Sequence, residues 1–185
     1  MRIADATAAV LERLPDALYV AALGTVTSAL RDVSGDGPHL YMGGAMGSAV
    51  AVALGVAERV APRRVVALVG DGEMVMSART LWSVAGARPP NLLIVVMADG
   101  RYTMTGGQAI ETAATFAGAA AALPGLHSSR AATASELARA LAQMPLPGLI
   151  EVALDEPSVT RASPFVDPHR VRIAFEARAA RGAGP

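Results

Sequence analysis

Two aspartates follow apolar runs of the chain and are spaced to share one ligand. Asp71 lies in a Gly-Asp-Gly segment directly after the run VVALV, and Asp99 follows the run NLLIVVM, 28 positions later. One helix and one strand fit between them, which is the crossover length of adjacent parallel strands. Both carboxylates would then reach one point at the sheet edge. Together with a backbone carbonyl, phosphate oxygens and water, they could complete an octahedral Mg²⁺ site.

Glycines beside these aspartates suit a phosphate-binding turn. Gly70 and Gly72 allow close backbone approach to a ligand, and the N–H groups that begin a following helix can hold a phosphate. A surface turn is the alternative interpretation of Gly-Asp-Gly and of Asp99-Gly100 alike. A third glycine segment, YMGGAMG at 41–47, precedes an apolar helix, and its alternative is a helix start packed closely on the sheet. None of them matches G-x-G-x-x-G or a P-loop, so a nicotinamide or ATP site has little support.

The elements that must position these residues alternate between strands and helices. Strands are predicted at Ala17–Ala22, His39–Met42, Arg64–Val69, Asn91–Met97, Gly125–Ser128 and Gly148–Ala153. Helices are predicted at Ile3–Leu14, Val26–Val33, Ser48–Ala61, Met76–Ala87, Gln108–Ala122, Ser135–Gln143 and Pro168–Arg181. This alternation predicts one α/β domain over residues 1–185, with a doubly wound, mostly parallel sheet and helices on both faces. Ligands of such sheets bind at the carboxyl ends of the strands.

The composition removes several kinds of chemistry. The chain has no cysteine, which excludes a thiol nucleophile, a thiolate zinc site and a cysteine-ligated iron–sulfur cluster within it. All 16 basic residues are arginine, which excludes a Schiff-base lysine and a P-loop lysine. The formal net charge is zero with the charges interspersed, so neither a nucleic acid nor an anionic membrane is an expected partner. The first residues carry no apolar signal core, and the expected location is the cytoplasm.

The three segments together resemble thiamine diphosphate (ThDP) enzymes. The ThDP motif runs from Gly-Asp-Gly through about two dozen residues to Asn-Asn, and here 25 residues separate Gly72 from Ala98-Asp99. The segments YMGGAMG, VVALVGDGEMVM and PPNLLIVVMADGRYTMTGGQ are similar to the sulfopyruvate decarboxylase β subunit and to the C-terminal part of phosphonopyruvate decarboxylase. The resemblance runs from about Leu18 to the tail after Pro147 and implies the diphosphate-binding domain of a decarboxylase that acts on a small acidic 2-oxo acid.

The resemblance also implies roles for single residues near the diphosphate. Asp71 and Asp99 match side-chain ligands of Mg²⁺, and the carbonyl of Arg101 matches a backbone ligand. Positions in contact with the diphosphate are matched by Gly24, Thr25, Gly72 and Glu73.

Further positions match the rest of the cofactor. Gly44 matches a carbonyl that receives the aminopyrimidine amino group, and Met46 matches the bulky residue that bends the cofactor. The segment from Thr105 to Gln108 matches a loop over the cofactor. The remaining expected cofactor contacts are Ala45, Gly70 and Tyr102.

Two departures from the family pattern keep alternatives open. Asp99 stands where the family has Asn, and an extra carboxylate would tighten a cation but crowd the diphosphate. Glu73 replaces a small Ser, although transketolase-like chains also carry Glu there. The alternatives are a ThDP-dependent carboligase subunit, similar to acetolactate synthase, and a non-catalytic scaffold that has lost ThDP.

The resemblance places the activating Glu on a pyrimidine-binding domain that this chain lacks. We therefore expect that domain on a separate chain, in a hetero-oligomer of α2β2 or higher order, with the cofactor at the interface. Within this chain His39 is a candidate acid–base residue, because it precedes the strand that leads into the third glycine segment. Arg101 and Tyr102 could meet an anionic substrate, or could be a solvated Arg and a packed Tyr.

Overall fold

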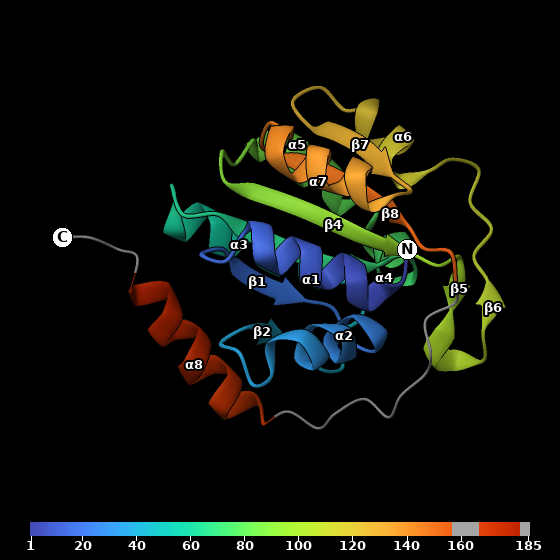
Figure 1. Cartoon of the computed structure of the whole chain (residues 1–185). Coiled ribbons are helices and arrows are strands. Elements are labelled where there is room, and N and C mark those ends of the chain that lie inside the picture. Colours follow the sequence, from blue (N-terminus) through green and yellow to red (C-terminus); the bar gives the residue numbers. More distant parts are fainter. Residues whose placement is uncertain (157–166, 182–185) are drawn as a thin grey trace.

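A six-stranded parallel sheet forms the centre of the computed structural model, which describes residues 1–156 and 167–181. The spatial order of its strands is β2-β1-β3-β4-β8-β7 (Figure 1). Their bounds are β1 Leu18–Ala21, β2 Leu40–Tyr41, β3 Val65–Gly70, β4 Leu92–Ala98, β7 His127–Ala131 and β8 Gly148–Ala153. The order runs outward from β1 in both directions, so the predicted doubly wound α/β fold is confirmed.

The central strands β3 and β4 owe their position to their composition. Both are near-continuous runs of Val, Leu, Ile and Ala, and their side chains are buried on both faces of the sheet. They pair in parallel from Val65 with Leu92 to Gly70 with Met97. Because the two strands end together, the residues that follow them, Asp71 and Asp99, emerge at the same edge.

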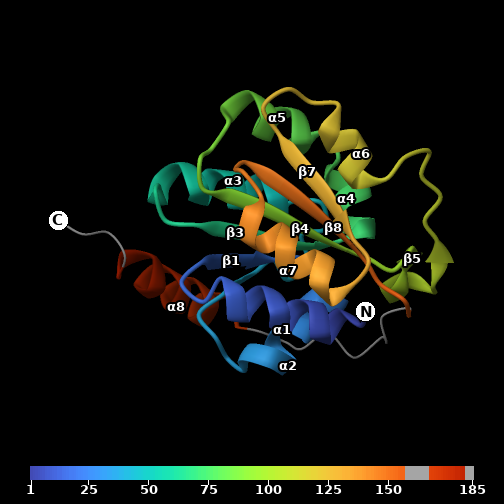
Figure 2. The ribbon, with the colours of Figure 1, turned by 45° about the horizontal axis from the view of Figure 1, so that its top comes forward.

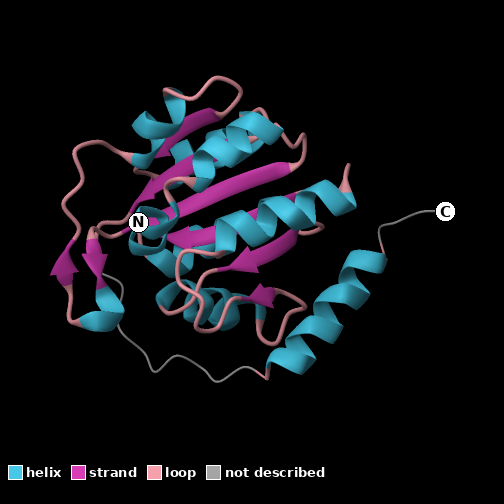
Figure 3. Cartoon of the chain, turned by 180° about the vertical axis from the view of Figure 1, so that it is seen from behind, coloured by secondary structure: helices cyan, strands magenta, loops and turns pink. Residues whose placement is uncertain are grey.

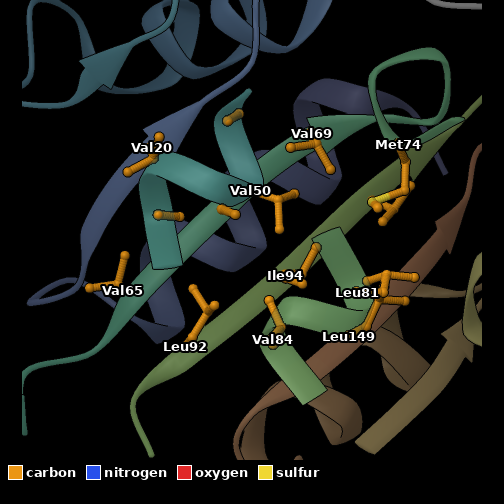
Figure 4. Close-up of a cluster of buried hydrophobic side chains, with 14 of the residues drawn as sticks. Val20, Val50, Val65, Val69, Met74, Leu81, Val84, Leu92, Ile94 and Leu149 are labelled. Carbon is orange, nitrogen blue, oxygen red and sulfur yellow. The ribbon is translucent and has the colours of Figure 1, made fainter. Parts of the chain in front are cut away.

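Helices cover both faces of the sheet and enclose two separate cores. One face packs against α1 Ile3–Arg13, α2 Thr25–Ser34 and α7 Ala134–Gln143. The other packs against α3 Ala49–Val60, α4 Asp71–Ser77, α5 Thr80–Ala87 and α6 Phe116–Ala121, with a contribution from α8 Pro168–Ala180. Figure 2 shows the layers from another side, and Figure 4 shows the second core, where Val50 of α3 and Val84 of α5 face Ile94 of the sheet.

A small hairpin stands beyond the carboxyl ends of the strands, on the opposite side of the molecule from α8 (Figures 1 and 3). It consists of β5 Arg101–Tyr102, the 3₁₀ turn Thr103–Thr105 and β6 Gln108–Ala109, paired antiparallel. Gly106 and Gly107 both have positive φ, which only glycine adopts easily, and they turn the chain back.

Several predicted boundaries are wrong. The helix predicted for Gln108–Ala122 begins only at Phe116, because its first residues form β6 and Ile110 donates a backbone hydrogen bond to Gly100. The helix predicted for Met76–Ala87 begins earlier, at Asp71, and is divided into α4 and α5 at residues 78–79. The strand predicted at Gly125–Ser128 lies slightly later, at His127–Ala131. In the described parts of the chain, no helix has both the length and the apolar character needed to cross a membrane.

Candidate functional site

A cavity of about 350 Å³ opens at the carboxyl ends of β3 and β4. Its walls come from the start of α2, the turn before α3, the start of α4, the end of β4 and the hairpin. Its volume lies within the range of typical small-molecule sites. Ten residues singled out from the sequence line it: Thr25, Met46, Gly70, Asp71, Gly72, Glu73, Asp99, Arg101, Tyr102 and Thr105.

Asp71 is the most deeply buried acid of this cavity. Its side chain is 3% exposed, Oδ1 accepts the Gly72 N–H at 2.8 Å, and Oδ2 accepts the Gly100 N–H at 2.6 Å. Burial, together with the negative charge of Asp99, raises the pKa of Asp71 to about 6 despite the lowering effect of the backbone N–H groups of Gly100 and Gly72. Two interacting carboxyl groups thus lie at one cavity.

Asp99 organises the turn that leads from β4 into the hairpin. Its Oδ1 accepts the Arg101 N–H at 3.0 Å, and its Oδ2 accepts the Thr103 hydroxyl at 3.2 Å. Arg101 lines the cavity, and its guanidinium donates to the carbonyl of Gly107 at 2.9 Å, across the hairpin. In the described residues no three His, Asp or Glu side chains gather around one point. A cation here would thus be held by two carboxylates together with backbone oxygen, which suits Mg²⁺ more than a transition metal.

Gly72 forms part of the floor of the cavity, beneath the ring of Tyr102. A Cβ added at Gly72 would lie 2.8 Å from Tyr102 Cδ1 and 3.4 Å from Met46 Cε. Real Cβ atoms do not approach carbon so closely, so only glycine fits beneath this ring. Similarly, a Cβ on Gly24 would lie 2.9 Å from Met104 Cγ, which places the tip of the hairpin against the start of α2.

Glu73 is buried beside the cavity, and its carboxylate contacts backbone rather than open space. Its Oε2 accepts the Gly47 N–H at 2.6 Å and its Oε1 accepts the Ala49 N–H at 3.1 Å. These amides belong to the end of the YMGGAMG turn and to the first residue of α3. No signal in the sequence pointed to this link, because it joins segments 24 to 26 positions apart.

Four residues expected at the site do not line the cavity. Gly44 and Ala45 lie in the exposed turn that carries Met46, and Gly24 lies directly before Thr25. His39 precedes β2, where its Nε2 lies 3.1 Å from Ser34 Oγ and its ring meets the rings of Tyr19 and Tyr41 edge-on. Burial lowers the pKa of His39 to about 4, and Arg178 contributes to the same effect, so the ring is neutral at pH 7.

Apolar residues complete the walls of the cavity, and the sequence motifs did not single them out. They are Leu23, Val26, Met76, Met97 and Met104. Met97 lies near the carboxyl end of β4, where ligands of such sheets bind, and this position could have indicated from the sequence that Met97 lines the cavity. The methionines Met46, Met76 and Met104 are each more than a third exposed, at 38%, 54% and 39%.

A doubly wound sheet with two aspartates at the carboxyl ends of adjacent central strands is typical of a cofactor-binding domain. Residues 24–152 match the family "Thiamine pyrophosphate enzyme, C-terminal TPP binding domain". The chain belongs to this family, and the resemblance seen in the sequence is confirmed.

Its relatives include two kinds of decarboxylase. The chain is 36% identical over 177 residues to phosphonopyruvate decarboxylase of Streptomyces hygroscopicus, covering 90% of this chain and 44% of the relative. It is 35% identical over 129 residues to sulfopyruvate decarboxylase subunit beta of Methanothermobacter thermautotrophicus, covering 70% and 69% respectively. The chain thus spans less than half of the first relative's length.

A solved structure supports the same fold. The thiamine diphosphate-dependent 4-hydroxybenzoylformate decarboxylase of Rhodococcus jostii is 25% identical and superposes with a TM-score of 0.72. The superposition covers 85% of this chain and 33% of that chain. The fold of this chain therefore corresponds to one part of a larger enzyme.

Proposed function

We propose that this chain is the diphosphate-binding subunit of a ThDP- and Mg²⁺-dependent decarboxylase that acts on a small acidic 2-oxo acid. The observation that carries the proposal is that Asp71 and Asp99 line one cavity at the carboxyl ends of β3 and β4 in a member of the thiamine pyrophosphate family. Sulfopyruvate and phosphonopyruvate are the substrates named for its relatives, and a substrate of that kind is the one we propose.

The residues present fit the cofactor and its metal. Asp71, Asp99 and the carbonyl of Arg101 would hold Mg²⁺, because carboxylate and carbonyl oxygens are the ligands that this cation prefers and all three residues line one cavity. The backbone at Gly72 would approach the diphosphate, and Met46 would form the wall beside the rest of the cofactor. When bound, thiamine diphosphate supplies the electron sink that takes up the electron pair released as CO₂ leaves the substrate.

The contribution of this chain is to bind and orient. Asp71 is fixed by two backbone N–H groups, so its oxygens are already in place before the cofactor arrives. Arg101 is a residue of the cavity wall, and its guanidinium would offer positive charge to the anionic group of a sulfonated or phosphonated substrate. The apolar side chains of the walls would keep water away from the reacting centre once a partner covers them.

A second chain would supply the pyrimidine-binding domain and the activating Glu. Two observations support this part of the proposal: one relative is named as a subunit, and the chain covers 44% of a relative with the related activity. The methionines Met46, Met76 and Met104 line the cavity and are exposed, so a partner that covers the cavity would also bury them. We propose a hetero-oligomer of α2β2 or higher order.

The test is a turnover assay on the purified chain, alone and with a candidate pyrimidine-binding chain. We expect CO₂ release from sulfopyruvate or phosphonopyruvate only in the mixture with ThDP and Mg²⁺. Full-rate decarboxylation by the chain alone would exclude the need for a partner. Product analysis with and without an acceptor aldehyde separates a decarboxylase from a carboligase, since only a carboligase converts the acceptor.

A further inference from the structure

Helix α3 begins without a capping side chain of its own. Ser48 at its N-cap position makes no side-chain hydrogen bond to the helix, and its first turn contains no acidic residue. The first N–H groups of a helix need acceptors from outside the helix, and the helix dipole favours a negative charge there. In this chain another element supplies the acceptor: the carboxylate of Glu73 in α4 accepts the N–H groups at the start of α3.

The two bonds of Glu73 fix the end of the turn that carries Met46. Oε2 binds the N–H of Gly47, the residue directly after Met46, and Oε1 binds the N–H of Ala49. Glu73 is 4% exposed, so its carboxylate lies where hydrogen bonds are strong and a lost partner is costly. Gly47 has φ +86°, and a Cβ there would lie 3.2 Å from Met76 Cβ, so α4 contacts the turn at a second point.

Met46 depends on this turn for its direction. Its Cε reaches to 3.4 Å from the position of an added Cβ at Gly72, in the floor of the cavity. The turn itself is exposed at residues 43–46, and its backbone bonds within the described part of the chain are short-range, apart from the Met42 N–H that donates to the Ala21 carbonyl. A turn that is free to move would let Met46 leave the cavity.

We infer that Glu73 is a positioning residue, which caps α3 from α4 and thereby holds Met46 in the cofactor cavity. It acts through the turn and not by binding the diphosphate itself. The role of Met46 beside the cofactor rests on the proposed function. The capping of α3 by Glu73 does not depend on the proposed function. Glu73 thus joins the segment after β3 to the segment after β2.

The first arm of the test is amide hydrogen exchange on the chain without cofactor. In Glu73→Ala we expect the Gly47 and Ala49 amides to exchange at least about tenfold faster, whereas amides in β3 and β4 stay protected. Glu73→Gln keeps one acceptor oxygen at the same reach and should restore part of the protection. Glu58→Ala, which removes an exposed carboxylate from α3 itself, is the control and should change neither amide.

The second arm is a double-mutant cycle read by calorimetric titration of ThDP with Mg²⁺ into the complex with the partner chain. We expect Glu73→Ala to weaken binding about tenfold, but less than about twofold when Met46→Ala is already present. Equal losses in both backgrounds, or unchanged exchange of Gly47 and Ala49, would overturn the inference. If the wild-type complex binds no ThDP, the proposed function fails, and the exchange arm still decides whether Glu73 caps α3.

Discussion

The carboxylate of Asp71 accepts a hydrogen bond from the backbone N–H of Gly100 at 2.6 Å, across 29 positions of sequence. This bond joins the Gly-Asp-Gly segment after β3 directly to the Asp99-Gly100 turn after β4. The two motifs therefore form one unit at the sheet edge even without a ligand. A cation placed there would meet oxygens already ordered by the protein.

The contact between Gly72 and Tyr102 predicts a steric effect. Gly72→Ala would place a methyl group 2.8 Å from Tyr102 Cδ1, and we expect a loss of about 1–3 kcal/mol in unfolding free energy together with weaker ThDP binding. Urea unfolding measures the first effect. Gly86→Ala in α5 is the matched control, because nothing lies near its added Cβ, and it should stabilise by up to about 1 kcal/mol. If Tyr102→Ala did not relieve the cost of Gly72→Ala, this explanation would be wrong.

Asp99→Asn should keep the turn and change the electrostatics. An Asn oxygen can still accept the Arg101 N–H, and its amide can donate to the Thr103 hydroxyl. Removing this charge removes one cause of the raised pKa of Asp71. We expect the pKa of Asp71 to fall and the binding of Mg²⁺ alone to weaken. The variant should still bind the ThDP–Mg²⁺ complex. NMR titration and calorimetry measure these quantities, and an unchanged Asp71 pKa would refute the proposed coupling of the two carboxyls.

Burial of Asp71 gives the metal-free chain a pH-dependent stability. Its pKa rises from 3.8 to about 6 on folding, so the folded state binds the proton more tightly. The resulting stabilisation amounts to a total on the order of 3 kcal/mol. It is fully present below about pH 4 and is lost as the pH rises through about 6.

The measurement is the difference in unfolding free energy between wild type and Asp71→Asn across pH 4 to 8. Burial lowers the pKa of His39 to about 4, so the contribution of His39 to the unfolding free energy is lost as the pH falls. This contribution is the same in both proteins and cancels in the difference. We expect wild type to lose stability relative to Asp71→Asn as the pH rises, with no further change above about pH 7. A flat difference would mean that Asp71 is not desolvated.

Arg101→Ala tests the recognition of an acidic substrate. Arg101 lines the cavity and its guanidinium donates to the Gly107 carbonyl, so its substitution removes a positive charge from a residue of the cavity wall. We expect KM to rise about tenfold or more for sulfopyruvate or phosphonopyruvate, and much less for pyruvate, which lacks the second anionic group. An equal rise for both kinds of substrate would assign Arg101 only to the stability of the hairpin.

The sheet, and the meeting of Asp71 and Asp99 at its edge, could be predicted from the sequence because they depend on local patterns. The runs that became β3 and β4 are apolar enough to require burial on both faces, and parallel strands bring Asp71 and Asp99 to one edge. The family resemblance placed Gly72 and Tyr102 at the site but could not show that the ring lies on the glycine.

The failures arose where distant contacts decide the structure. The residues from Gln108 to Thr115 have a composition that suits a helix, but the backbone bond from Ile110 to Gly100 and the pairing of β5 with β6 hold the first of them extended. The link from Glu73 to Gly47 likewise joins side chain to backbone across elements, and no periodicity records such a link.

We propose that Asp71 and its cavity bind ThDP through a divalent cation and that a partner chain completes the site. Calorimetric titration of ThDP with Mg²⁺ into this chain, alone and mixed with the pyrimidine-binding chain, tests it most directly. We expect binding that requires Mg²⁺, is tighter with the partner and is lost in Asp71→Ala but not in the exposed control Glu58→Ala. No binding in either mixture would contradict the claim and would leave a scaffold that keeps the fold without the cofactor.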